Sequence, residues 1–358
     1  MSKAGKSKRP AGAAGGAAKR PGGRRLPALS VVAAQWADRP PEETLHTAAL
    51  AGELGYPELW IGEASTYDAF ALATAIGLAT ERIAFTIGPF SMTTRDPAMI
   101  AMGAASVASL THHPVTIAVT TPSSAPGAPG AEDANTDDTH SAEGNDADAD
   151  ACDTDAGGGG LGRVAVLDGL LRGDADGAGG TTRLPAAGGG VTVAALESAA
   201  VRTAAEHADR VVLDLVNAAT AARVRGELDE AAARLDRAAP RLTVRLPVVV
   251  DPAPEALAQL VRGLVPYLGM PGHREMFTAA GFGEVADLAH GGAAYQEIVR
   301  ALPLEIVGTV GLIGTRAEIT ERLAEYAASG VDEVALIPAT AGDRGGATTL
   351  TALHALHP

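Results

Sequence analysis

Short apolar segments alternate with helical segments along most of the chain, and each apolar segment is flanked by polar residues or glycine. Runs rich in valine, isoleucine and alanine are typical of strands buried on both faces, as in a parallel sheet. The pattern predicts eight strands: Leu29–Gln35, Glu58–Gly62, Arg82–Gly88, Val115–Thr120, Val191–Leu196, Arg210–Val216, Leu242–Val250 and Glu333–Ile337.

Helices are predicted between these strands. Asp96 places a capping residue before Pro97, and Thr315 with Glu318 forms a capping box, so both sites begin helices. Other predicted helices are Pro41–Leu54, Asp68–Thr80, Ala199–His207, Ala218–Ala238 and most of 253–309, and regular patterning is also present at Val164–Arg172. Eight strands alternating with helices predict a (β/α)8 TIM barrel. A doubly wound open sheet is the alternative, although no G-x-G-x-x-G sequence follows the first strand.

Two biased segments lie outside this pattern. Residues 1–28 carry eight Lys/Arg and no acid, which predicts a disordered basic tail; an arm for nucleic acid or a protein partner is the alternative. Residues 125–162 form an acidic Gly/Asp-rich segment after the fourth strand, which we interpret as an insertion. The barrel is then expected over 29–343, and 344–358 is set apart as a C-terminal tail.

Composition excludes several classes of function. The formal net charge of −15 repels phosphates, so neither nucleic acid nor an anionic membrane is expected as a partner. The single cysteine, Cys152, excludes an intrachain disulfide and a cysteine-based metal site, and the scattered histidines suggest no metal ligand set. Without a membrane-length apolar run or a signal-peptide pattern, we expect a cytoplasmic protein.

Five segments carry a family resemblance: Leu54–Phe70, Ala79–Ala101, Ala194–Val216, Val265–Gly283 and Val310–Asp343. In order and spacing they resemble the luciferase-like monooxygenase superfamily, and within it the branch that uses the deazaflavin coenzyme F420. The resemblance implies a (β/α)8 barrel that binds a flavin-type ring at the C-terminal ends of its strands. It also implies a homodimer.

The resemblance further implies a cis peptide after the third strand, where it backs the coenzyme ring. The matching bond joins Gly88 to Pro89, and Ser91 follows. Before proline a cis bond costs only about 0.5–1 kcal/mol, compared with about 3 kcal/mol elsewhere. An ordinary trans proline at the end of a strand is the alternative.

Polar side chains at the predicted strand ends are the candidate catalytic residues. Trp36 is a candidate to stack near the ring, and Glu63 to orient substrate or relay a proton, with Asp68 beside it. In the alternative interpretation, Glu63 pairs with an arginine and Trp36 fills the barrel mouth.

The loops expected to bind the coenzyme phosphate depart from the family pattern, which has a Gly-rich turn after strand four and a Gly-Pro after strand five. Here strand four is followed by hydroxyl donors, Thr120, Ser123 and Ser124. The helix after strand five begins near Ala195, Glu197 and Ser198, and a carboxylate at this helix start opposes phosphate binding.

Two classes of function remain open. The first is an oxidoreductase that transfers a hydride between F420 and an organic small molecule, with an FMN-dependent monooxygenase as the variant. The second is a barrel that has lost coenzyme binding and acts as a binding or scaffold protein.

Deletion of residues 125–160 tests the insertion. The barrel should stay folded, because these residues contribute almost no large apolar side chain to a core. Thermal unfolding followed by circular dichroism measures this, and a large fall in melting temperature would show that the segment packs on the barrel.

Overall fold

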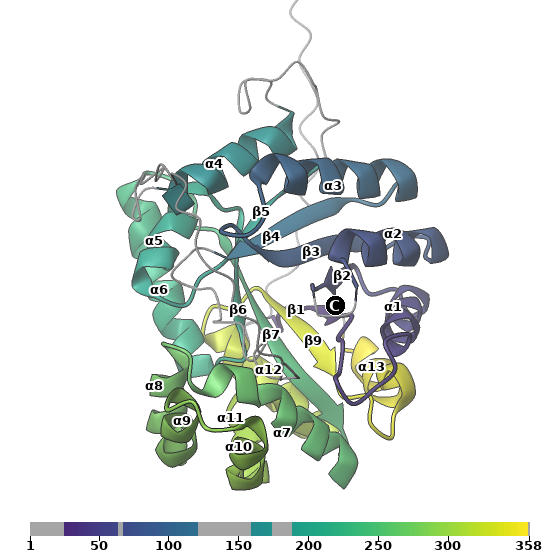
Figure 1. Cartoon of the computed structure of the whole chain (residues 1–358), viewed down its shortest axis with the longest axis vertical. Coiled ribbons are helices and arrows are strands. Elements are labelled where there is room, and N and C mark those ends of the chain that lie inside the picture. The colour runs from purple at the N-terminus through teal and green to yellow at the C-terminus, as the bar shows by residue number, and fades with distance from the viewer. Residues whose placement is uncertain (1–24, 64–66, 121–158, 174–187, 357–358) are drawn as a thin grey trace, which may run out of the picture.

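The computed structural model describes residues 25–63, 67–120, 159–173 and 188–356. Eight parallel strands form a closed ring in which β6 pairs with β7, β7 with β9, and β9 with β1 (Figure 1). The strands are β1 (Ala28–Val32), β2 (Glu58–Ile61), β3 (Ala84–Ser91), β4 (Val115–Thr120), β5 (Gly188–Ala194), β6 (Arg210–Asp214), β7 (Arg241–Val250) and β9 (Glu333–Pro338). The predicted TIM barrel is confirmed, and the open sheet is excluded.

A further strand, β8 (Leu312–Gly314), was not predicted. It pairs in parallel with the last residues of β7, so it extends that strand's edge and is not one of the eight barrel strands. Three residues before the helix cap at Thr315 are too few to show a hydrophobic period.

The helices surround the ring of strands (Figure 1). Asp68, Asp96, Asn217 and Thr315 each accept a backbone N–H at a helix start, as the capping rules require. The helices between strands are α1 (Glu43–Leu54), α2 (Ala69–Ala79), α3 (Pro97–Thr111), α4 (Gly159–Arg172), α5 (Ser198–His207), α6 (Ala218–Arg234) and α12 (Arg316–Ala328).

The long segment between β7 and β8 is helical, as predicted. It contains α7 (Pro254–Leu268), α8 (His273–Phe277), a π-helical turn (Thr278–Phe282), α9 (Gly283–His290), α10 (Tyr295–Ala301), a 3-10 turn (Leu304–Ile306) and α11 (Val307–Val310). In Figure 1, α8, α9 and α10 form one group on the same side of the barrel as α7.

The C-terminal residues that we had set apart as a tail are in part integral to the fold. They include α13 (Ala347–His354), in which Leu350 and Leu353 are buried. The Tyr56 hydroxyl donates to the Leu350 carbonyl oxygen at 2.8 Å. At the other end, β1 already begins at Ala28, while residues 1–24 of the predicted basic tail and 125–158 of the predicted insertion lie outside the described residues. The last residues of the predicted insertion, 159–162, belong to α4.

The inside of the barrel is filled by a small apolar layer around Trp60, which has no exposed surface. On the side where the strands begin, the buried Arg210 donates to Glu58 at 2.7 Å and to Glu333 at 3.3 Å. The Arg210 guanidinium also lies 4.5 Å from the Trp60 ring centroid. Burial, followed by repulsion from Glu58, raises the pKa of Glu333. One arginine therefore holds two carboxylates inside the barrel.

Replacement of Arg210 by alanine should strongly destabilise the barrel. It removes the cation shared by the half-buried Glu58 and the buried Glu333, and leaves Glu333 with only the exposed Arg241 at 3.2 Å, a loss of up to about 3–5 kcal/mol for a broken buried ion pair. Urea-induced unfolding measures the change. The control is Arg234→Ala, which removes an exposed i,i+4 pair with Glu230 at 3.5 Å and should change stability by less than about 0.5 kcal/mol. Equal effects of the two substitutions would contradict the assigned role of Arg210.

Candidate functional site

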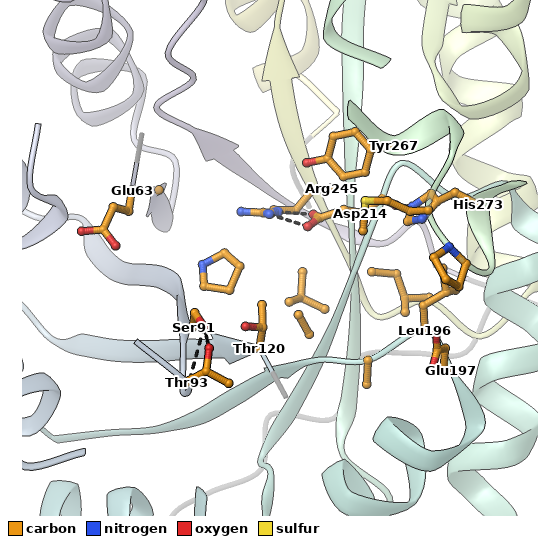
Figure 2. A pocket seen from close by; sticks show the side chains of 18 of the residues that line it. Glu63, Ser91, Thr93, Thr120, Leu196, Glu197, Asp214, Arg245, Tyr267 and His273 are labelled. Atoms are coloured by element: carbon orange, nitrogen blue, oxygen red, sulfur yellow. Dashed lines mark hydrogen bonds and ion pairs between the residues drawn. The ribbon is translucent and has the colours of Figure 1, made fainter. Parts of the chain in front are cut away.

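A cavity of about 590 Å³ lies at the C-terminal ends of the barrel strands (Figure 2). Parallel barrels build their active sites at this end of the strands. The residues at or just after the strand ends that line the cavity are Gly62, Glu63, Pro89, Ser91, Thr120, Ala194, Ala195 and Asp214. The volume is within the range of small-molecule and cofactor sites.

The structure brings most of the predicted site residues to this cavity and leaves others away from it. Glu63, Pro89, Ser91, Thr120, Ala195 and Glu197 line it. Gly88 precedes Pro89, whereas Ser198, Trp36 and Asp68 are not among the lining residues. Ser123 and Ser124 lie outside the described residues.

The bond between Gly88 and Pro89 is cis, as the family resemblance implied. Gly88 has φ +114°, and a Cβ at this position would lie 2.3 Å from the Ala118 carbonyl oxygen. Only glycine fits this conformation and this close approach. The pairing of β3 with β4 shifts register between Ile87 and Phe90, which places Pro89 in the cavity lining at an irregular point of the strand.

Arg95 bridges two of the predicted catalytic carboxylates. It pairs with Glu63 and, at 2.8 Å, with Asp68, and its guanidinium lies 4.9 Å from the Phe90 ring centroid. Asp68 also caps α2 by accepting from two backbone N–H groups. Although burial raises the pKa of Asp68, Arg95 and these N–H groups lower it below the usual value. The pairing of Glu63 with an arginine matches the alternative interpretation, and the catalytic role of Glu63 stays a prediction.

Trp36 lies beside a second cavity, of about 500 Å³. Its indole N–H donates to the Pro338 carbonyl oxygen at 3.1 Å, which fixes the ring where β9 ends. Tyr267 is the residue that lines both cavities among those described, so the two spaces adjoin there. Trp36 and Glu63 therefore belong to different cavities.

An ion pair in the first cavity was not predicted. Arg245 on β7 donates to Asp214 at the end of β6, with 2.5 Å between Nη2 and Oδ2. Burial lowers the pKa of Arg245, but attraction to Asp214 outweighs it and the pKa is raised. The signal was present in the sequence, because Asp214 and Arg245 each place a charge next to a run of apolar strand residues. We had treated both as parts of their strands.

Tyr267 and His273 complete this part of the lining. Burial raises the pKa of Tyr267 to about 12, so the phenol stays protonated at neutral pH. His273, which we had set aside as one of several scattered histidines, contacts the Asp214 carbonyl oxygen through Nε2 at 2.7 Å. A carbonyl only accepts, so Nε2 carries the hydrogen. Burial lowers the pKa of His273, and Nδ1 of the neutral ring has no hydrogen-bond partner among the described residues.

A sequence model for the luciferase-like monooxygenase family matches residues 24–112 and 163–333. The chain belongs to this family. Among the residues matched are β1 to β3, β6 and β7, and most of the cavity lining. No curated protein sequence matches the chain.

Solved structures with the same fold include two F420-dependent proteins and one protein bound to FMN. The first, a coenzyme F420-dependent tetrahydromethanopterin reductase from Methanopyrus kandleri, has a TM-score of 0.67 and 15% identity over 92% of this chain and 97% of that one. The second is an F420-dependent secondary alcohol dehydrogenase bound to an F420–acetone adduct. Its TM-score is 0.63, and it is 14% identical over 92% of this chain and 98% of its own. The third is a type II Baeyer–Villiger monooxygenase from Pseudomonas putida bound to FMN. Its TM-score is 0.59, and it is 13% identical over 92% of this chain and 98% of its own.

The cavity fits the two ends of such a coenzyme differently. Its volume, its mostly apolar lining and the cis proline suit a planar ring system. The start of α5, where the family pattern has a Gly-Pro, carries Glu197 instead, and its side chain forms no capping hydrogen bond. The ring end fits the described residues; a phosphate at α5 does not.

Two features are absent from the described residues. No helix there has the length and apolar character to cross a bilayer. No cluster of three or more His, Cys, Asp or Glu side chains there is arranged to hold a metal ion.

Acidification should reveal the buried His273. Below its ordinary pKa of 6.5 the unfolded chain binds a proton that the folded chain does not, so stability falls as pH falls. His273→Gln keeps an N–H donor for Asp214 but removes this titration. Relative to the variant, the wild type should lose at most about 1.4 kcal/mol per pH unit between pH 6.5 and 5. Urea unfolding at several pH values measures it, and parallel pH profiles would contradict it.

Proposed function

We propose that the chain is an oxidoreductase that transfers a hydride between a flavin-type ring and a small organic molecule. The ring, of the coenzyme F420 kind, would lie across the strand ends against Pro89. The observation that carries the proposal is the cavity beside the cis Gly88–Pro89 bond in a chain of the luciferase-like family. When bound, such a ring supplies the hydride chemistry.

The residues of the chain supply position and polarity. The Gly88–Pro89 backbone backs one face of the ring, and Thr120 and Ser91 offer hydroxyl groups along its edge. The Arg245–Asp214 pair is neutral as a whole, so it contributes dipoles without a net charge. Tyr267 keeps its phenolic proton and can donate it as a hydrogen bond to a substrate oxygen.

The second cavity is the proposed place for the organic molecule. Its lining is largely apolar and aromatic, with Trp36, Tyr267 and Tyr295, and Arg262 there is paired with Asp38. An uncharged organic molecule would lose little hydration energy on entering such a space. Because Tyr267 lines both cavities, a molecule in the second would approach a ring in the first.

F420 is the coenzyme we propose first, with FMN as the alternative. Of the three solved structures described above, the F420-dependent reductase has the highest TM-score. The FMN complex supports the alternative, in which the chain is a monooxygenase. The second candidate function is a non-catalytic barrel that acts as a binding or scaffold protein. Glu197 at the start of α5 favours it over an enzyme that needs to bind a phosphate there. The homodimer implied by the family stays a prediction.

A cavity-filling substitution tests where the ring binds. Ala194 lies at the end of β5, lines the cavity and packs against the barrel's inner layer. A phenyl group there would occupy the ring's space, so Ala194→Phe should weaken binding of F420 or FMN at least about tenfold, or 1.4 kcal/mol. Titration followed by flavin or deazaflavin fluorescence measures the affinity.

The matched control is Ala222→Phe, which adds the same phenyl group at an exposed position of α6. It should leave affinity unchanged, and circular dichroism checks that both variants fold. Equal binding by wild type and Ala194→Phe would place the ring elsewhere. Absence of binding by wild-type protein, with either coenzyme and with its unphosphorylated form at high concentration, would leave the non-catalytic barrel.

A further inference from the structure

The end of the cavity at α5 is acidic. Glu197 occupies the N-cap position of α5, and its side chain caps no backbone N–H there. It lines the cavity together with the neighbouring Leu196. Figure 2 shows Glu197 below Leu196, on the opposite side of the view from Glu63. A carboxylate thus stands where backbone N–H groups would otherwise receive an anion.

The cations among the described residues around this end do not offset that charge. Arg245 is the only lysine or arginine that lines the cavity within the described part of the chain, and it is paired with Asp214. Arg223 donates to the Leu196 carbonyl oxygen at 3.2 Å, but it is paired with Glu227 at 2.5 Å. A ligand phosphate would therefore meet an uncompensated carboxylate.

His273 adds a second acceptor on the same side of the cavity. It is only 4% exposed, it lines the cavity, and its Nδ1 lacks a partner among the described residues. The preceding Gly272 lies against Leu196, since a Cβ on Gly272 would be 2.7 Å from Leu196 Cδ2. The start of α8 at Gly272 therefore packs against Leu196, the residue before Glu197. Glu197 and the buried Nδ1 of His273 are both hydrogen-bond acceptors, so neither group favours an anion at this end of the cavity.

We propose that the cavity takes a flavin or deazaflavin whose ribityl chain ends in a free hydroxyl, and that Glu197 disfavours the same compound with a phosphate. This inference rests on the proposed function. Ribityl hydroxyls can donate to the Glu197 carboxylate, whereas the phosphate monoester of FMN carries close to two negative charges and the phosphodiester of F420 carries one, and both offer acceptors. The ring end of the site is unaffected, so the discrimination concerns only the far end of the chain.

Direct binding measurements test the proposal. Wild-type protein is titrated at pH 8 with riboflavin, FMN, F420 and the deazaflavin that ends in a free ribityl hydroxyl, and binding is followed by fluorescence. Riboflavin and FMN differ by the phosphate alone, whereas the deazaflavin pair differs by the whole phosphodiester-linked side chain of F420. In each pair the unphosphorylated compound should bind more tightly by about tenfold, which corresponds to 1.4 kcal/mol. Tighter binding of the phosphorylated member in both pairs would overturn this inference and leave the proposed function intact. Absence of binding by all four would overturn both.

Glu197→Gln assigns the effect to the carboxylate. The variant keeps the side-chain size and removes the charge, so FMN should gain about tenfold in affinity while riboflavin stays within about twofold. The control is Glu206→Gln, which removes the same charge from the last turn of α5, away from the cavity lining, and should change neither affinity. An unchanged preference in Glu197→Gln, with circular dichroism like that of the wild type, would show that Glu197 is not the discriminating group.

Discussion

The barrel depends on how its interior is filled. Eight parallel strands that close into a ring leave an inner space that side chains must occupy. Aromatic residues are only 3% of this chain, and one of them, Trp60, lies at the centre of that space. Its ring lies 4.5 Å from the guanidinium carbon of Arg210 and 5.7 Å from that of Arg245. The two cations therefore contact the same indole, an arrangement in which the ring's electron-rich face favours positive charge.

Buried guanidinium groups in turn require carboxylates, and this requirement links the fold to the site. Arg210 is held by Glu58 and Glu333 where the strands begin, and Arg245 by Asp214 where they end. The second pair lines the cavity, so one set of interactions both fills the barrel and shapes the site. Because Arg245 is neutralised within this set, its charge is not available to a ligand. The net charge of the cavity is therefore set by the acidic residues on the loops, Glu63 and Glu197.

Much of the fold could be predicted, because each strand carries its own local signal. Val115–Thr120 was predicted with the bounds that the structure shows, and the caps at Asp96 and Thr315 are formed. The place of each side chain around the barrel could not be predicted in the same way. Trp36 and Glu63 both follow a strand, yet they lie at different cavities. The tilt of the strands and the path of the loops decide which cavity a residue lines, and neither the tilt nor the path leaves a local pattern in the sequence. Arg245 needed its partner, 31 residues away in sequence, before it could be interpreted.

The ring end and the phosphate end of the site are subject to different constraints. Pro89 lines the cavity from within β3, and Gly88 cannot accept a Cβ because the Ala118 backbone lies against it. A change there would disturb the barrel itself. Glu197 lies in a loop, forms no capping hydrogen bond and is not required by any strand pairing. The charge at the phosphate end can therefore differ while the barrel and the ring end stay the same. Under the proposed function, this chain would keep the space for a tricyclic ring while Glu197 selects against a charged group at the far end of the ribityl chain.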